Sequence, residues 1–186
     1  MKKIHFLAMT LVLLFCVSAL WANPPLPRAQ APVYTTAFGQ SPDSNFVNVL
    51  ARRVGLNQTH MSIGNPEGAE WNNARTLIAV IGGSMKGLGA AGVGVPAEIR
   101  RCDSFITSAR AQNKFIIGMH IGGEDRRGPT SQDFLHFASE VDFLIVRADG
   151  NRDGFFTRLA SERGIPLYTI EHTREIERIL REIFEL

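Results

Sequence analysis

The segment RTLIAVIGGSMKGLGAAGVG, residues 75–94, carries the clearest fold signal in the sequence. Residues 76–81 are apolar or β-branched without a break, which is typical of a parallel strand buried on both faces. Six glycines then follow between positions 82 and 94, together with Ser84 and Lys86. Because glycine lets the backbone approach a bound molecule closely, we interpret the segment as a central strand followed by a ligand-facing loop.

The same order of strand, polar loop and helix recurs on both sides of this segment. Apolar segments predict further strands at residues 33–38, 114–119, 143–146 and 165–170, with a weaker one near 59–63. Amphipathic patterns predict helices at residues 42–54, 97–112, 130–141, 155–163 and 173–184. This alternation predicts a doubly wound α/β domain, Rossmann- or flavodoxin-like, with a mostly parallel sheet of roughly five to six strands and helices on both faces.

The first helix has a well-marked start and an apolar side. Ser41 is expected to cap it, with Pro42 at the first helical position and Asp43 at the positive end of the helix dipole. Gly55 is expected to end it. The predicted apolar stripe consists of Phe46, Val47, Leu50 and Val54.

The amino-terminal residues 1–22 have the pattern of an export signal. Lys2 and Lys3 precede an apolar run, and Ala22 provides a small residue at the expected cleavage point. We expect a periplasmic or extracellular protein, with an uncleaved anchor as the alternative. Residues 23–32 contain four prolines and are interpreted as a linker, so residues 33–186 form the single α/β domain.

Composition excludes several classes of partner. Loss of residues 1–22 brings the formal net charge from +2 to about zero, so we expect no nucleic-acid partner and no membrane contact apart from the export signal. Cys102 is then the remaining cysteine, which leaves no internal disulfide. Its place on an apolar helix stripe indicates an inert core residue.

Parallel strands bring four polar loops to one edge of the predicted sheet. The loops are GQSPDSN (39–45), the glycine loop 82–94, HIGGEDRRG (120–128) and ADGNRDG (148–154). Their glycines and basic side chains predict a binding site for a small anion such as a carboxylate or phosphate. The expected ligand-binding residues are Gly82, Gly83, Ser84, Lys86, Gly87, His120, Gly122, Gly123, Arg126, Asp149, Asn151 and Arg152.

Known cofactor and metal motifs are incomplete. The glycine run lacks the lysine that a P-loop needs after Gly87, and no nicotinamide motif accompanies it. Asp149, Asn151 and Asp153 match the opening of a calcium loop, but the closing position holds Ala160. We therefore predict neither a cofactor nor a metal, and interpret the acidic turn as a cap of the next helix through Asp153.

Catalysis is the alternative to simple binding. Ser84, His120 and Asp149 follow three different predicted strands and are the candidate catalytic residues. A nucleophile elbow would need glycine where Lys86 stands. The sequence therefore favours Ser84 as a ligand contact, keeps a hydrolase with His120 as base and an acidic partner as the alternative, and leaves a partner module of an envelope or transporter complex as a third hypothesis.

The loop motifs together resemble a known family. GQSPDSN, IAVIGGSMKGLGAAG, IGMHIGGEDRRG and ADGNRDGFFTRLA are similar to segments of small exported bacterial proteins grouped as a domain of unknown function. The resemblance extends over residues 33–186. It implies a single secreted α/β domain and brings no catalytic residues with it.

Overall fold

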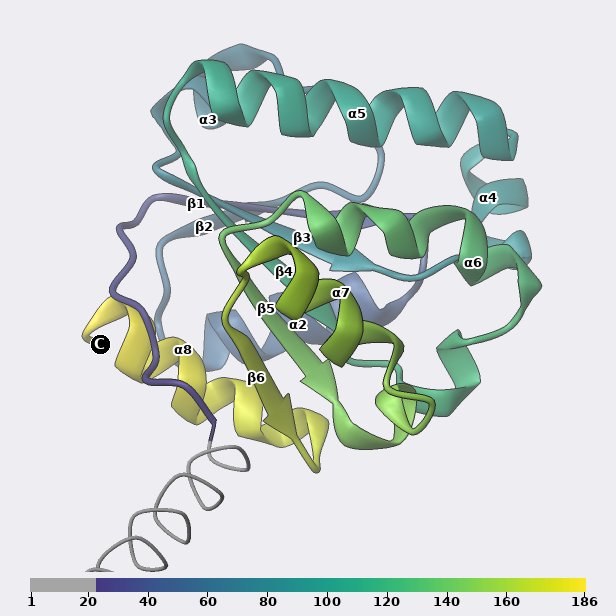
Figure 1. Ribbon diagram of the computed structural model, residues 1–186. Coiled ribbons are helices and arrows are strands. Elements are labelled where there is room, and N and C mark those ends of the chain that lie inside the picture. Colours follow the sequence, from purple (N-terminus) through teal and green to yellow (C-terminus); the bar gives the residue numbers. More distant parts are fainter. Residues whose placement is uncertain (1–22) are drawn as a thin grey trace, which may run out of the picture.

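The computed structural model describes residues 23–186, so the predicted export signal lies outside the described residues. Six strands form one parallel sheet in the order β2-β1-β3-β4-β5-β6 (Figure 1). The predicted α/β class and the parallel sheet are confirmed. The strands are β1 (Val33–Phe38), β2 (Gln58–His60), β3 (Thr76–Ile81), β4 (Phe115–His120), β5 (Phe143–Arg147) and β6 (Leu167–Ile170).

Helices cover both faces of the sheet (Figure 1). They are α2 (Asp43–Arg53), α3 (Gly68–Asn73), α4 (Met85–Ala91), α5 (Val95–Ala111), α6 (Pro129–Leu135), α7 (Phe155–Arg163) and α8 (Ile176–Phe184). Short 3-10 turns connect them at η1 (Gly123–Arg126), η2 (His136–Ser139), η3 (Ala148–Asn151) and η4 (Thr173–Glu175). None of the described helices has both the length and the apolar composition that a membrane crossing requires.

Two separate cores lie on the two faces of the sheet. One is aromatic, and in it Trp71 of α3, Phe105 of α5 and Phe156 of α7 pack on the sheet. The other is aliphatic and is formed mainly with α2 and α8. All residues of β1 and β3 are buried, as the unbroken apolar pattern of residues 76–81 predicts for a central strand.

The structure corrects several expected elements. The glycine loop contains α4, and the segment before β3, expected to be a loop, contains α3. Phe46 is 63% exposed instead of belonging to the buried stripe, because it lies about 100° around the helix from Val47, at the margin of the buried side. The helix expected over residues 130–141 ends at Leu135 and continues as the turn η2.

Residues 23–32 are not a free linker. The Asn23 side chain accepts a hydrogen bond from the Thr169 backbone N–H at 2.6 Å and donates to the Thr169 carbonyl at 2.9 Å. Leu26 and Ala29 pack against the aliphatic core, and the Ala29 N–H donates to the Ile183 carbonyl. We call residues 23–32 the strap, because this segment ties β6 and α8 to the rest of the domain.

The strap is expected to contribute to stability. A chain that begins at Ala31 should unfold with a free energy roughly 2 to 4 kcal/mol lower than a chain that begins at Asn23, since it loses apolar burial and the Asn23 hydrogen bonds. Urea denaturation of the two chains measures the difference. Equal midpoints would show that the contacts of the strap do not contribute to the free energy of unfolding.

Candidate functional site

The strand order creates a switch point between β1 and β3. The chain leaves β1 toward β2 on one side and reaches β3 on the other, so the loops after these two strands diverge at the carboxyl edge of the sheet. Ligands of doubly wound folds bind at such crevices. A cleft of about 410 Å³ lies here, lined by Gln40, Ser41, Pro42, Asn45, Ser62, Ile63, Ser84, Lys86, Gly87, Ala90 and Ala91.

Three predicted site residues meet in this switch-point cleft: Ser84, Lys86 and Gly87. Ser84 caps α4, and its Oγ accepts the Gly87 N–H at 3.1 Å. Lys86 is exposed and forms no ion pair within residues 23–186. Its ammonium is therefore available to a ligand in the cleft.

The glycines beside the cleft make room for protein backbone. A Cβ atom on Gly87 would lie 1.9 Å from the Gln40 carbonyl oxygen, and one on Gly83 would lie 2.3 Å from the Thr130 carbonyl oxygen. Gln40 and Gly83 also form an isolated antiparallel bridge. At these two positions glycine thus allows the loops to pack on each other, which is a different use from the expected approach to a ligand.

A buried carboxylate holds the loop that follows β1. Glu98 is 1% exposed, and its Oε1 accepts the Gly39 N–H at 3.0 Å and the Gln40 side-chain amide at 3.1 Å. Arg101 donates to both Glu98 oxygens at 2.8 Å. Burial, with Glu98 close by, raises the pKa of the Cys102 thiol well above its ordinary value, in agreement with the inert role predicted for this residue.

Arg101 extends this network to the sheet and to the next loop. Its guanidinium donates to Thr36 Oγ1 and to the Gly64 carbonyl at 3.2 Å each, and to the Ala37 carbonyl. Sequence reasoning missed both residues of the pair. The sequence does contain one indication of a buried acid. Glu98 stands four positions before Cys102, so it lies on the apolar stripe of α5.

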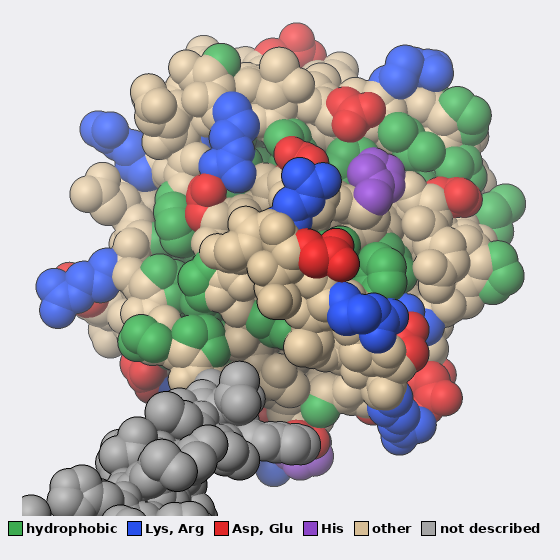
Figure 2. All heavy atoms as spheres, in the orientation of Figure 1, with side chains coloured by type: hydrophobic (Ala, Val, Ile, Leu, Met, Phe, Trp, Pro, Cys, Tyr) green, Lys and Arg blue, Asp and Glu red, His purple; other side chains and the backbone are tan. Residues whose placement is uncertain are grey.

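The arginines at the rim are paired with carboxylates. Figure 2 shows acidic and basic side chains side by side on one face of the molecule. The pairs at the carboxyl edge are Arg126–Asp43 at 3.1 Å, Arg127–Asp153 at 2.7 Å, Arg147–Asp149 at 2.6 Å and Arg152–Glu124 at 2.5 Å. An anion cradle made by Arg126 and Arg152, as expected from the sequence, would have to compete with these carboxylates.

Two predicted glycines accommodate these ion pairs. A Cβ atom on Gly122 would lie 2.4 Å from Asp43 Oδ2, and one on Gly123 would lie 2.1 Å from Arg147 Nη2. Gly82 has no such close contact. The glycines of the loop after β4 therefore let oppositely charged side chains meet across the rim.

His120 is sealed beneath the rim. Its ring is fully buried and packs on Phe156 with 4.8 Å between the ring centroids. Nδ1 lies 3.0 Å from the Ile81 carbonyl oxygen, so this nitrogen carries the proton, and Nε2 has no partner within the described residues. Burial lowers the pKa of His120, which keeps the imidazole neutral near pH 7.

No hydrolase triad is assembled within residues 23–186. Ser84 Oγ serves as a helix cap, Asp149 is bonded to Arg147, and His120 forms no hydrogen bond to a carboxylate. The hydrogen bond from Arg147 lowers the pKa of Asp149. The geometry therefore gives the catalytic hypothesis for these three residues no direct support.

The acidic turn after β5 caps α7, as predicted. Asp153 Oδ1 accepts the Phe155 N–H at 3.1 Å, and Asn151 Oδ1 accepts the Phe156 N–H at 2.9 Å. The Arg127 hydrogen bond lowers the pKa of Asp153 to about 2. In the described part of the chain no three potential metal ligands of the His, Cys, Asp or Glu type cluster together.

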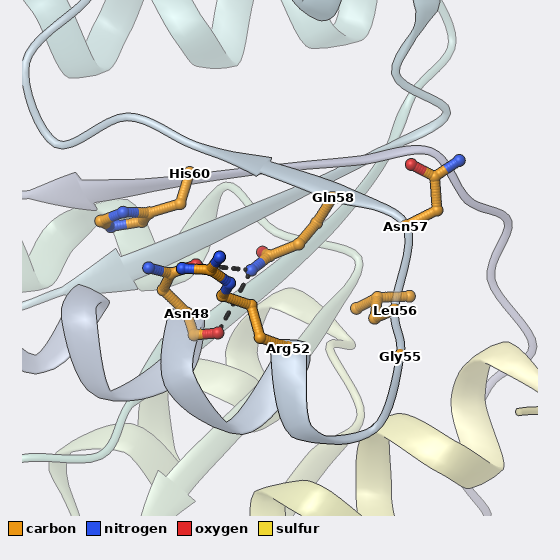
Figure 3. Close-up of a pocket in the computed structure, with 7 residues that line it drawn as sticks. All are labelled: Asn48, Arg52, Gly55, Leu56, Asn57, Gln58 and His60. Atoms are coloured by element: carbon orange, nitrogen blue, oxygen red, sulfur yellow. Dashed lines mark hydrogen bonds between the residues drawn. The ribbon is translucent and has the colours of Figure 1, made fainter.

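A larger hollow of about 530 Å³ lies between α2 and the edge strand β2 (Figure 3). Its lining is polar and includes Arg52, Gln58 and His60. Gln58 Nε2 donates to Asn48 Oδ1 at 2.9 Å, which ties β2 to α2. The hollow contains none of the residues expected from the sequence and lies away from the switch point.

The fold and the cleft define a flavodoxin-like α/β domain with a crevice at its β1/β3 switch point. The chain belongs to the family described as "Domain of unknown function (DUF6305)", whose model matches residues 30–184. No curated protein matches the sequence. A solved structure with a remote similarity is a mutant of a DJ-1 superfamily protein from Salmonella typhimurium, with 12% identity, 77% of this chain and 74% of that chain covered, and a TM-score of 0.32.

The Glu98 network is expected to be essential for folding. Glu98→Ala removes the acceptor of the Gly39, Gln40 and Arg101 donors and leaves a buried guanidinium without its carboxylate, which should cost about 3 to 5 kcal/mol of unfolding free energy. The exposed pair Arg178–Glu182 provides the control, and Glu182→Gln should cost less than about 0.5 kcal/mol. Equal effects in urea denaturation would contradict a central role for Glu98.

Two glycines of α4 allow a matched test of the loop packing. Gly87→Ala should destabilise the protein by about 1 to 3 kcal/mol, because its methyl group meets the Gln40 carbonyl. A methyl group on Gly89 would meet no atom within 4 Å apart from its chain neighbours and the backbone of its own helix, so Gly89→Ala should stabilise the helix by roughly 0.5 to 1 kcal/mol. Thermal and urea unfolding measure both; effects of the same sign would refute the proposed contact.

Proposed function

We propose that the protein binds a small organic anion, a carboxylate or a phosphate, in the switch-point cleft. The observation that carries this proposal is the position of a cleft of about 410 Å³ where the loops after β1 and β3 diverge. This is the place where the doubly wound fold binds its ligands.

The lining of the cleft supports an anion that also has an apolar part. Lys86 provides a cation that no carboxylate of the described chain neutralises, and Ser41 and Asn45 provide polar groups. Ile63, Ala90 and Ala91 provide apolar surface. A charged head and a short hydrocarbon body would match this combination.

The cellular location of this binding follows from the sequence expectation. Residues 1–22 have the pattern of an export signal, so we propose that binding takes place outside the cytoplasm. The proposed role is capture of a metabolite and not its chemical conversion, because His120 is fully buried and does not line the cleft.

A partner surface is the second candidate function. Exposed apolar side chains concentrate in α2, in the loop after β2 and at the start of α4: Phe46, Val49, Met61, Ile63 and Met85. Apolar groups exposed beside a site favour contact with another protein. An envelope or transporter component is the proposed partner class.

Ligand binding is tested by calorimetry with octanoate, succinate, phenyl phosphate and inorganic phosphate. We expect at least one organic anion to bind, and Lys86→Ala to weaken it about tenfold, which corresponds to about 1.4 kcal/mol. Arg152→Ala removes the same charge from an exposed arginine outside the cleft and should leave binding unchanged.

Two outcomes would contradict the anion proposal. Absence of binding by all four anions would favour the partner surface as the function of this edge. Equal weakening by Arg152→Ala and Lys86→Ala would place the anion among the rim arginines instead of in the cleft.

A further inference from the structure

A second hollow at the carboxyl edge lies on the other side of the first turn of α2. It has a volume of about 200 Å³ and is lined by Asp43, Phe46, Ile121, Gly122, Asp125, Arg126, Arg147 and Thr173. These residues come from α2, from the ends of β4 and β5, and from the turns η1 and η4. We call it the mixed-charge hollow, because its lining contains two arginines and two aspartates.

Both arginines keep unused hydrogen-bond donors. Arg126 uses its Nε–H toward Asp43, and Arg147 uses Nε and Nη2 toward Asp149. A guanidinium carries five N–H groups, so each side chain retains N–H groups without an acceptor in residues 23–186. Asp43 orients the guanidinium of Arg126 and Asp149 orients that of Arg147. The remaining N–H groups are left for a ligand carboxylate.

Asp125 provides the opposite charge. Its carboxylate takes part in no hydrogen bond or ion pair within the described chain, whereas Asp43 is paired with Arg126. Asp125 still lies close enough to Arg147 to favour its charged form. An unpaired acid beside partly free arginines means that the hollow presents acceptors and donors at once.

Phe46 gives the hollow an apolar wall. Phe46 is 63% exposed, whereas Val47 and Leu50 of the same helix are buried. Ile121 forms a buried part of the lining, and its carbonyl accepts a hydrogen bond from Thr173 at 3.2 Å, which holds η4 against the end of β4. The side chains are therefore presented from fixed elements.

We propose that the mixed-charge hollow binds a small zwitterion, an α-amino acid with an apolar side chain. The ligand carboxylate accepts hydrogen bonds from the free N–H groups of Arg126 and Arg147. The ligand ammonium donates to Asp125, and the ligand side chain packs on Phe46. Each charge of the ligand meets an opposite charge, and the volume of the hollow suits a molecule of this size.

The local sequence fits this arrangement. Gly122 is required, since a Cβ atom there would lie 2.0 Å from Arg126 Cγ and would displace the side chain. The run from Gly122 to Arg126 thus combines the glycine that admits the arginine, the acid for the ammonium and the arginine for the carboxylate.

Calorimetry of the Lys86→Ala variant, whose switch-point cleft lacks the proposed anion-binding cation, with L-leucine, L-phenylalanine, glycine and 3-phenylpropanoate tests the proposal. L-leucine and L-phenylalanine should bind, glycine should bind at least tenfold more weakly for lack of a side chain, and 3-phenylpropanoate should bind at least tenfold more weakly than L-phenylalanine for lack of the ammonium. Equal binding of L-phenylalanine and 3-phenylpropanoate, or no binding of either amino acid, would overturn the proposal.

Two exposed substitutions locate the ligand without disturbing the fold. Asp125→Asn should weaken the binding of L-phenylalanine about tenfold and leave the weak binding of 3-phenylpropanoate unchanged. Asp133→Asn removes the charge of an exposed acid on α6 and is the control. Phe46→Ala should weaken the binding of L-phenylalanine more than the binding of glycine. Val49→Ala, which removes another exposed apolar side chain of α2, is the control. Unchanged affinity in both Asp125→Asn and Phe46→Ala would overturn the assignment.

The same titrations separate this site from the switch-point cleft. Lys86→Ala should leave amino-acid binding unchanged, because Lys86 lines the other hollow. Loss of amino-acid binding in Lys86→Ala would place the ligand in the cleft and overturn the second site. Failure of the organic anions to bind would leave amino-acid binding unaffected.

Discussion

The buried Glu98 carboxylate is the contact on which the carboxyl edge of the sheet depends. It joins α5 to the backbone after β1, and Arg101 joins the same carboxylate to β1 and to the loop after β2. A buried ion pair has a net cost unless its remaining hydrogen bonds are satisfied, and here backbone and side-chain groups satisfy them. The position of Gln40, and with it one wall of the switch-point cleft, follows from this network.

Most charged side chains at the rim are paired with an opposite charge of the protein, and a few are left without such a partner in residues 23–186. Most rim arginines neutralise a neighbouring aspartate or glutamate, and glycines at positions 122 and 123 give these pairs the space they need. Lys86 and Asp125 stand outside these pairs, one in each hollow. Two neighbouring hollows of the same edge therefore differ in the sign of their unpaired charge, and the ligands proposed for them differ accordingly.

The elements that local sequence determines were predicted well. The bounds of β1 and β3 agree with the apolar runs, because strand burial on both faces leaves a continuous pattern. The helix α4 was missed, since its glycines mask a start that Ser84 caps. The ion pair between Arg126 and Asp43 joins positions 83 residues apart. No local sequence pattern could therefore reveal that Arg126, which was expected to bind an anion, already has Asp43 as its partner.

The two outer strands of the sheet differ in how they are protected. The side-chain amide of Asn23 occupies the backbone groups of Thr169, so a foreign strand can pair along β6 only after the strap has left. No hydrogen bond comparable to that of Asn23 reaches the outer backbone groups of β2 from another part of residues 23–186. Self-association by strand pairing would thus join two molecules back to back and end there, since neither copy offers a second open side from which a fibre could grow.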